Sequence, residues 1–236
     1  MFGRLHAKVP WMVDQAARRK AESEALLGDL LSRPRGLRVK ALLEEPRLRA
    51  SDLLEASQEA QIGDPERAVA LADLALELAG RFVQEESSET AETVECARAS
   101  IVKANAYRLL GNLALAEKAL CGATYFLAWP LDSCVRGEFC RVLGLVRWEQ
   151  GRLDEAAGML RQAARAFGER CLPQEEGASL VLCGLLRLEQ NRADMAIRLL
   201  QRGRGALDPA ARPGSPCAPG SASRWPIRRS GRRAGR

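Results

Sequence analysis

Small and apolar positions recur along this chain at one fixed interval. The segments GNLALA, GRLDEA and NRADMA, at residues 111–116, 151–156 and 191–196, align without a gap. A leucine follows the last alanine of each segment by four residues, and a small residue follows that leucine by three: Leu120 and Ala123, Leu160 and Ala163, Leu200 and Gly203. Self-similarity at a fixed period of this length predicts a repeat array.

Within the array, the spacing of apolar residues predicts helices that alternate with short breaks. A Gly or Asn directly after a helix favours the left-handed conformation that closes it, and Gly111, Gly151 and Asn191 occupy such breaks. Asp64 can cap the free amides of a following helix, and Pro65 suits the first turn of that helix. The expected helices are 53–62, 66–82, 90–110, 113–128, 131–150, 153–169, 173–190 and 193–207.

The alanines of the repeat suit close packing between helices. Ala116, Ala156 and Ala196 let two helix backbones approach each other, and the leucines four residues later fill the seam between neighbouring pairs. One helix pair buries too little surface to be stable alone, so stacking of the pairs is expected to supply the stability. The fold class is therefore expected to be all-α, a solenoid of antiparallel helix pairs.

These residues resemble the tetratricopeptide repeat (TPR) family over 49–207. The turn glycines Gly111 and Gly151 and the alanines of the second helix fall on the expected columns, and Leu143-Gly144 and Cys183-Gly184 match the Leu-Gly pair of the first helix. The period of 40 exceeds the common TPR period of about 34, Asn191 replaces a turn glycine, and prolines occur only between repeats, as Pro130, Pro173 and Pro209. The chain is nearer to longer-period repeats similar to those of kinesin light chain or polarity adaptors, and it also resembles uncharacterised bacterial TPR proteins rich in Ala, Leu and Arg. The resemblance implies a right-handed superhelical solenoid.

Residues 1–48 are expected to form a separate N-terminal helical segment, broken at Pro34 and Pro46. Residues 1–50 carry 11 basic and 6 acidic side chains. The run Arg18-Arg19-Lys20 is interpreted as a solvated helix face, with contact to nucleic acid or to an acidic partner as the alternative.

The segment 209–236 differs abruptly in composition from the array. It holds seven Arg, five Pro and no acidic residue, whereas residues 1–208 hold 29 basic and 30 acidic side chains, so the net charge of +6 lies outside the repeats. We expect 208–236 to be disordered, because little in it can bury a core. Three interpretations stay open: a basic tail that binds phosphate or an acidic surface, an inert extension, or an out-of-frame translation of GC-rich codons. The third is favoured, because a repeat array needs a polar capping helix and none follows residue 207.

The chemistry of known catalytic and metal sites is missing from the sequence. There is one histidine, His6, and no Walker A, GxGxxG or GxSxG motif, so we expect no enzyme, no cofactor and no metal site. The seven cysteines form no CxxC pair and are expected to be free thiols packed between helices. With no signal peptide and no run of about 20 apolar residues, the chain is expected to be cytoplasmic and to have no membrane contact.

The expected function is that of a protein-interaction scaffold in a regulatory assembly, with an unidentified protein or peptide as partner. The TPR resemblance implies that the concave face, lined by the first helix of each pair, binds this partner. The alternative is a nucleic-acid-associated regulator that uses its basic ends, and self-association through the last helix pair is also expected. The candidate partner-binding residues are Arg98, Asn105, Arg108, Arg141, Leu145, Trp148, Leu185 and Leu188. For the four apolar ones, packing against neighbouring helices is the alternative interpretation.

The substitution Ala156→Arg tests the stacking model. A guanidinium at a helix crossing would force two pairs apart, so we expect more than one repeat to unfold together. A thermal melt followed by circular dichroism that matches the wild type within error would contradict this expectation.

Overall fold

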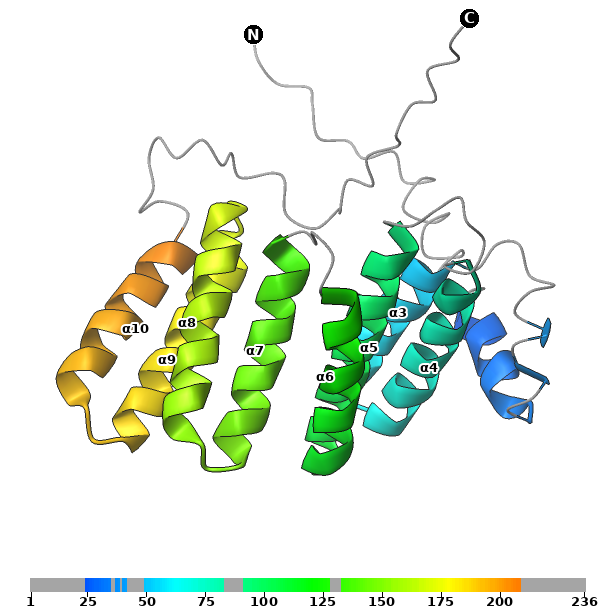
Figure 1. Ribbon diagram of the computed structural model, residues 1–236, viewed down its shortest axis with the longest axis horizontal. Helices are drawn as coiled ribbons and strands as arrows, with labels where there is room; N and C mark the ends of the chain where they lie inside the picture. The colour runs from blue at the N-terminus through cyan, green and yellow to red at the C-terminus, as the bar shows by residue number, and fades with distance from the viewer. Residues whose placement is uncertain are drawn as a thin grey trace, which may run out of the picture.

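The computed structural model describes residues 24–34, 37–38, 40–41, 49–82, 91–127 and 133–208. Within these ranges the chain is helical and contains no strand. The array consists of α3 (Ala50–Ala60), α4 (Pro65–Phe82), α5 (Ala91–Leu109), α6 (Leu113–Leu127), α7 (Ser133–Glu149), α8 (Leu153–Glu169), α9 (Pro173–Glu189) and α10 (Ala193–Leu207). In Figure 1 the helix pairs follow one another in chain order, from α3–α4 at one end of the row to α9–α10 at the other.

Neighbouring helices pack against each other along the row. The extensive contacts lie within the pairs α3–α4, α5–α6, α7–α8 and α9–α10 and between α4 and α5 and between α8 and α9. The contact between α6 and α7 is the smallest between consecutive helices. The observed bounds follow the predicted ones closely, apart from α3, which begins three residues earlier than expected.

The predicted helix closures are confirmed. Gly111, Gly151 and Asn191 have φ values of 73°, 76° and 57°. The amide after each donates a 2.9 Å hydrogen bond to the carbonyl five residues back, onto Tyr107, Arg147 and Arg187 respectively. This six-residue closure satisfies a carbonyl that the helix would leave free.

A fourth closure of the same kind follows α8 and was not predicted. Cys171 has φ of 56°, and the amide of Leu172 donates to the carbonyl of Phe167 at 3.0 Å. The sequence gives no sign of this left-handed residue, because a side chain with a Cβ rarely adopts the conformation. The predicted capping at the start of α4 is confirmed: the amide of Arg67 donates to Asp64 Oδ1 at 2.9 Å.

Small residues bring the two helices of a pair into close contact. Ala116, Ala156 and Ala196 are completely buried. A Cβ added to Gly144 would lie 3.0 Å from Leu160 Cγ, and one added to Gly184 would lie 2.8 Å from Leu200 Cγ. Gly137 meets Phe167, and Gly177 meets Leu207, in the same way. The pair α9–α10 therefore repeats the contacts of the pair α7–α8 at equivalent positions of the next repeat.

A further helical stretch, residues 24–32, precedes the array. Its Leu27 and Leu30 are buried in one core cluster with Leu53 and Leu54 of α3, so this helix covers the α3–α4 end of the row (Figure 1). The Arg18-Arg19-Lys20 run, Pro46, Pro130 and the segment 209–236 lie outside the described residues.

None of the helices in the described part of the chain is long and apolar enough to cross a membrane.

Two glycine substitutions test the packing of the pairs. We expect Gly184→Ala to lower the free energy of unfolding by about 1–3 kcal/mol, because the new methyl group would displace Leu200. Gly158→Ala, in the middle of α8, meets no atom within 4 Å and should raise stability by about 0.5–1 kcal/mol through helix propensity. Urea unfolding of both variants gives the comparison, and equal effects in the two would refute it.

Candidate partner-binding face

The eight residues predicted to bind a partner lie on three helices of the row. Three of them lie on α5, three on α7 and two on α9. Side-chain contacts link the turn after α3 to α5, α5 to α7 and α7 to α9, so the odd-numbered helices form one continuous surface. We call the surface formed by the eight residues the candidate partner-binding face.

On α5 the polar candidates are held by neighbouring helices. Asn105 Nδ2 donates to Gln61 Oε1, from the turn after α3, at 2.7 Å. Asn105 Oδ1 accepts from Arg108 Nε at 2.9 Å, and Arg108 forms an ion pair with Glu149 of α7. The amide and the guanidinium thus connect three helices, and their hydrogen-bonding groups are used within the protein.

Arg98 and Arg141 belong to a partly buried charged cluster between α5, α7 and α9. Arg98 Nε lies 3.9 Å from Glu138 Oε2, and Arg141 forms an ion pair with Glu175 of α9. The Arg141 guanidinium also lies over the Phe167 ring, 5.6 Å from its centre. Burial raises the pKa of the Glu138 carboxyl, although Arg98 and Arg141 oppose this shift. The two guanidinium groups therefore offset part of the cost of removing this carboxyl from water.

The apolar candidates differ from one another in exposure. Trp148 Nε1 donates to Glu189 Oε2 of α9 at 2.7 Å, and Leu145 is half-buried. Leu185 and Leu188 expose 42% and 45% of their surface. Of the eight predicted residues, these two leucines therefore present the most open apolar surface.

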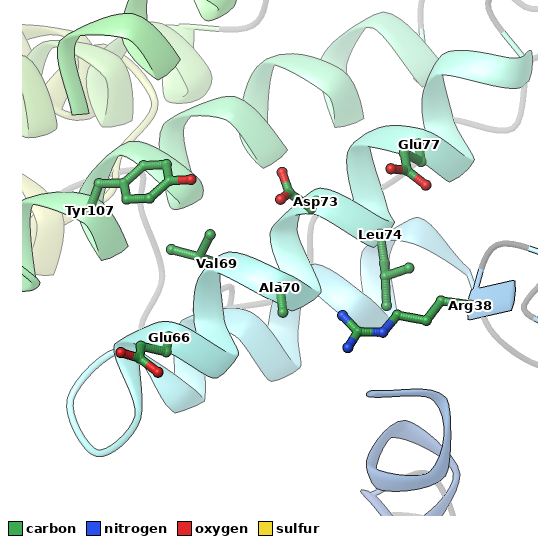
Figure 2. A pocket seen from close by; sticks show the side chains of 8 residues that line it. All are labelled: Arg38, Glu66, Val69, Ala70, Asp73, Leu74, Glu77 and Tyr107. Carbon is green, nitrogen blue, oxygen red and sulfur yellow. The ribbon is translucent and has the colours of Figure 1, made fainter. Parts of the chain in front are cut away.

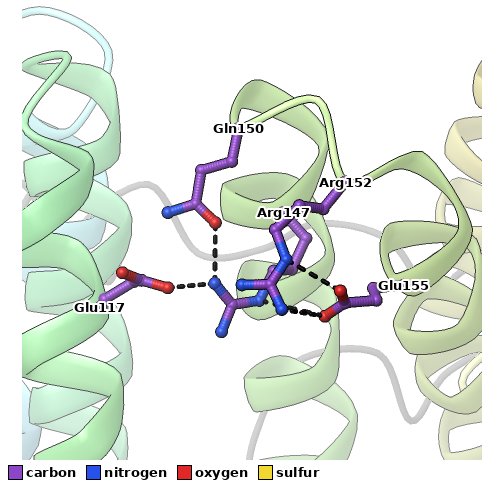
Figure 3. A network of polar contacts seen from close by, with 5 residues as sticks. All are labelled: Glu117, Arg147, Gln150, Arg152 and Glu155. Carbon is purple, nitrogen blue, oxygen red and sulfur yellow. Dashed lines mark hydrogen bonds and ion pairs between the residues drawn. The ribbon is translucent and has the colours of Figure 1, made fainter.

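A polar network that was not predicted from the sequence links α6 to α7 and α8 (Figure 3). Arg147 of α7 forms an ion pair with Glu117 of α6 and donates to Gln150 Oε1 at 2.7 Å. Arg147 Nε lies 3.7 Å from Glu155 of α8, which also pairs with Arg152 at 2.7 Å. The hydrogen bond from Arg147 holds the pKa of the Glu117 carboxyl below its ordinary value. The network bridges the place where the helix contact is smallest.

An equivalent arginine, Arg187, occupies the same position in the next repeat and is almost fully buried. Its Nη1 donates to Asp154 Oδ1 of α8 at 3.3 Å, and it also bonds Gln190. Hydrogen bonds from Gln190 and Arg187 lower the pKa of the Asp154 carboxyl. The sequence carries a signal for the contacts of Arg147 and Arg187, because GLVRWEQ at 144–150 and GLLRLEQ at 184–190 share the arginine and the glutamine.

A shallow groove of about 300 Å³ runs along α4, away from the predicted residues (Figure 2). Its carboxylates are those of Glu66, Asp73 and Glu77, and Asp73 pairs with Lys103 of α5 at 2.6 Å. The spacing of these acids along α4 places them near one helix face, which is the signal that sequence reasoning did not use. The lining residues are Arg38, Glu66, Val69, Ala70, Asp73, Leu74, Glu77 and Tyr107.

The described cysteines are mostly buried thiols. Cys96, Cys134, Cys140 and Cys183 are buried thiols, and Cys121 is an exposed one. Burial raises the pKa of the Cys140 and Cys183 thiols, so they are protonated and poor nucleophiles. Cys171 is disulfide-bonded, so the expectation of free thiols is wrong at this position. The described residues contain no group of three or more His, Cys, Asp or Glu side chains placed to hold a metal ion.

No protein-family model matches the chain, and no curated protein matches it either.

The ion pair of Glu117 gives a test with a defined pH dependence. Because the folded-state pKa of Glu117 is lowered, its pair with Arg147 stabilises the fold above the ordinary pKa, and this contribution is lost as the pH falls through the folded-state value. Glu117→Gln should therefore lower stability by up to about 1 kcal/mol at neutral pH, a range that allows for solvent screening. In urea unfolding at an acidic pH below the folded-state pKa of Glu117, the variant and the wild type should nearly coincide.

Glu169→Gln serves as the matched control, since Glu169 is exposed on α8. It should follow the wild type at both pH values. A loss for Glu117→Gln that is equally large in acid would show that the ion pair is not its cause.

Proposed function

We propose that the chain is a TPR-like, right-handed solenoid that acts as a cytoplasmic protein-interaction scaffold in a regulatory assembly. Two features of the helix pairs support the fold assignment. The closures at Gly111, Gly151 and Asn191 recur at 40-residue intervals in the pairs α5–α6, α7–α8 and α9–α10, and Gly144 and Gly184 approach Leu160 and Leu200 in the same manner. The partner contacts the candidate partner-binding face.

One observation carries this proposal: two leucines of α9 are exposed on a face whose arginines already form ion pairs within the protein. Leu185 and Leu188 lie one helical turn apart and are about half exposed. Arg98, Arg108 and Arg141 form ion pairs with glutamates of neighbouring helices, so their charges are largely neutralised within the protein. Apolar contact is therefore the main source of binding free energy that this face offers.

The chemistry of the partner follows from this arrangement. A highly charged ligand would have to displace internal ion pairs, which costs free energy. A peptide or protein segment with apolar anchors, placed over Leu185 and against Trp148, would bury surface without breaking them. The nucleic-acid alternative depends on the basic ends, and most of their residues lie outside the described part of the chain.

Affinity capture with matched variants tests the proposal. The full chain, Leu185→Glu and Trp148→Ala serve as baits, and extract from cells that express the protein is used with and without nuclease treatment. We expect at least one protein to be enriched by the wild type and reduced about tenfold by each variant, equivalent to about 1.4 kcal/mol of binding free energy.

Tyr125→Glu is the control bait, because Tyr125 is 76% exposed on α6 and is not part of the candidate partner-binding face. It should capture the same protein as the wild type. Enrichment that survives both face variants would refute the proposed face, and enrichment that nuclease treatment abolishes would favour the nucleic-acid alternative.

A further inference from the structure

The last helix of the described residues, α10, has an exposed face with acidic, basic and apolar side chains. Their order along the helix lets this face pair with the same face of a second copy. Ile197 is 51% exposed, and Asp194, Gln201 and Arg204 are exposed too. At 3.6 residues per turn these four positions lie within about 80° of one another around the helix axis. They lie away from Ala196, Gly203 and Ala206, which α10 buries. We call these four residues the α10 end face.

The equivalent face of α8, one repeat earlier, is a helix–helix interface. Ala157, the counterpart of Ile197, is completely buried, and its carbonyl accepts from Cys183 Sγ of α9 at 3.8 Å. Asp154, the counterpart of Asp194, accepts from Arg187 of α9. On α10 the same positions are open, and the methyl group of alanine is replaced by the larger side chain of isoleucine.

The order of charges along α10 fits an antiparallel second copy of the same helix. If two α10 helices cross at a twofold axis near residue 199, Asp194 lies opposite the partner's Arg204, and Ile197 lies opposite the partner's Gln201. Asp194 and Arg204 are ten residues apart, about 15 Å along the helix, so two reciprocal ion pairs flank one apolar centre. Neither Asp194 nor Arg204 forms an ion pair with another described residue that would compete with this contact between two copies.

We propose that the α10 end face is the interface of a homodimer in which two copies pack α10 against α10. An isologous contact of this kind closes at two copies. A head-to-tail arrangement would need the opposite end of the row as well, and the helix of residues 24–32 covers that end with Leu27 and Leu30.

This inference stands apart from the proposed scaffold function, since it concerns α10 and the purified protein alone. The apolar centre is small, and an interface of this size falls among the weak ones. We expect a dissociation constant on the order of 10 µM, so the measurement must cover concentrations on both sides of that value.

Sedimentation equilibrium of the full chain between about 1 and 200 µM tests the dimer. The wild-type mass should rise from 25.8 kDa toward twice that value. Asp194→Arg alone and Arg204→Asp alone should each remain monomeric, because each variant places like charges opposite each other. An equimolar mixture of the two should dimerise again, since one copy then carries two cations on the face and the other carries two anions.

Two charge reversals elsewhere serve as controls. Glu55→Arg on α3 and Arg165→Glu on α8 change exposed residues outside the α10 end face and should dimerise as the wild type does. Ile197→Asp, which leaves the ion-pair residues in place, should be monomeric, and circular dichroism verifies that each variant keeps its helix content.

Several results would overturn the proposal. A wild type that stays monomeric throughout the range contradicts it, as do single variants that still dimerise or a mixture that does not. A mass that grows beyond two copies with concentration would indicate head-to-tail association instead.

Discussion

The close approach of the two helices in each pair is the constraint on which the array depends. Gly144 and Gly184 leave no room for a Cβ beside Leu160 and Leu200, so the leucines occupy the space that a larger residue would need. Side chains then interlock across the pair at near-crystalline density, and dispersion contacts and buried apolar area accumulate where two backbones nearly touch. The same contact recurs one period along the chain. A fold with few aromatic residues, 5% of the sequence, can thereby build its core clusters largely from alanine and leucine.

Polar contacts join one pair to the next. Arg147 and Arg187 reach backwards to carboxylates of the preceding helices, and Arg108 and Trp148 reach forwards to glutamates of the following ones. These contacts occupy the hydrogen-bonding groups of most residues that could otherwise form a charged binding face. Of the eight candidate residues, Leu185 and Leu188 present the most open apolar surface, and the proposed scaffold function depends on them.

Local pattern predicted much of the fold and little of the site. Helix positions and the closures at Gly111, Gly151 and Asn191 follow from spacing and from glycine or asparagine chemistry, and the structure confirms them. The closure at Cys171 carries no such signal. The partners of Arg98 and Arg108 both lie on α7, a whole repeat further along the chain, and a single sequence gives no information on which carboxylate each guanidinium meets. The groove along α4 also takes Tyr107 from α5 and Arg38 from before the array, so the sequence shows only its row of acids.

A double-mutant cycle between Gly184 and Leu200 tests the central claim most directly. If the glycine exists to make room for the leucine, combining Gly184→Ala with Leu200→Ala should destabilise the protein by at least about 1 kcal/mol less than the sum of the single changes. The parallel cycle with Gly158→Ala should be additive within about 0.5 kcal/mol, because Gly158 has no neighbour within 4 Å of an added Cβ. Additivity in both cycles, measured by urea unfolding, would contradict the account.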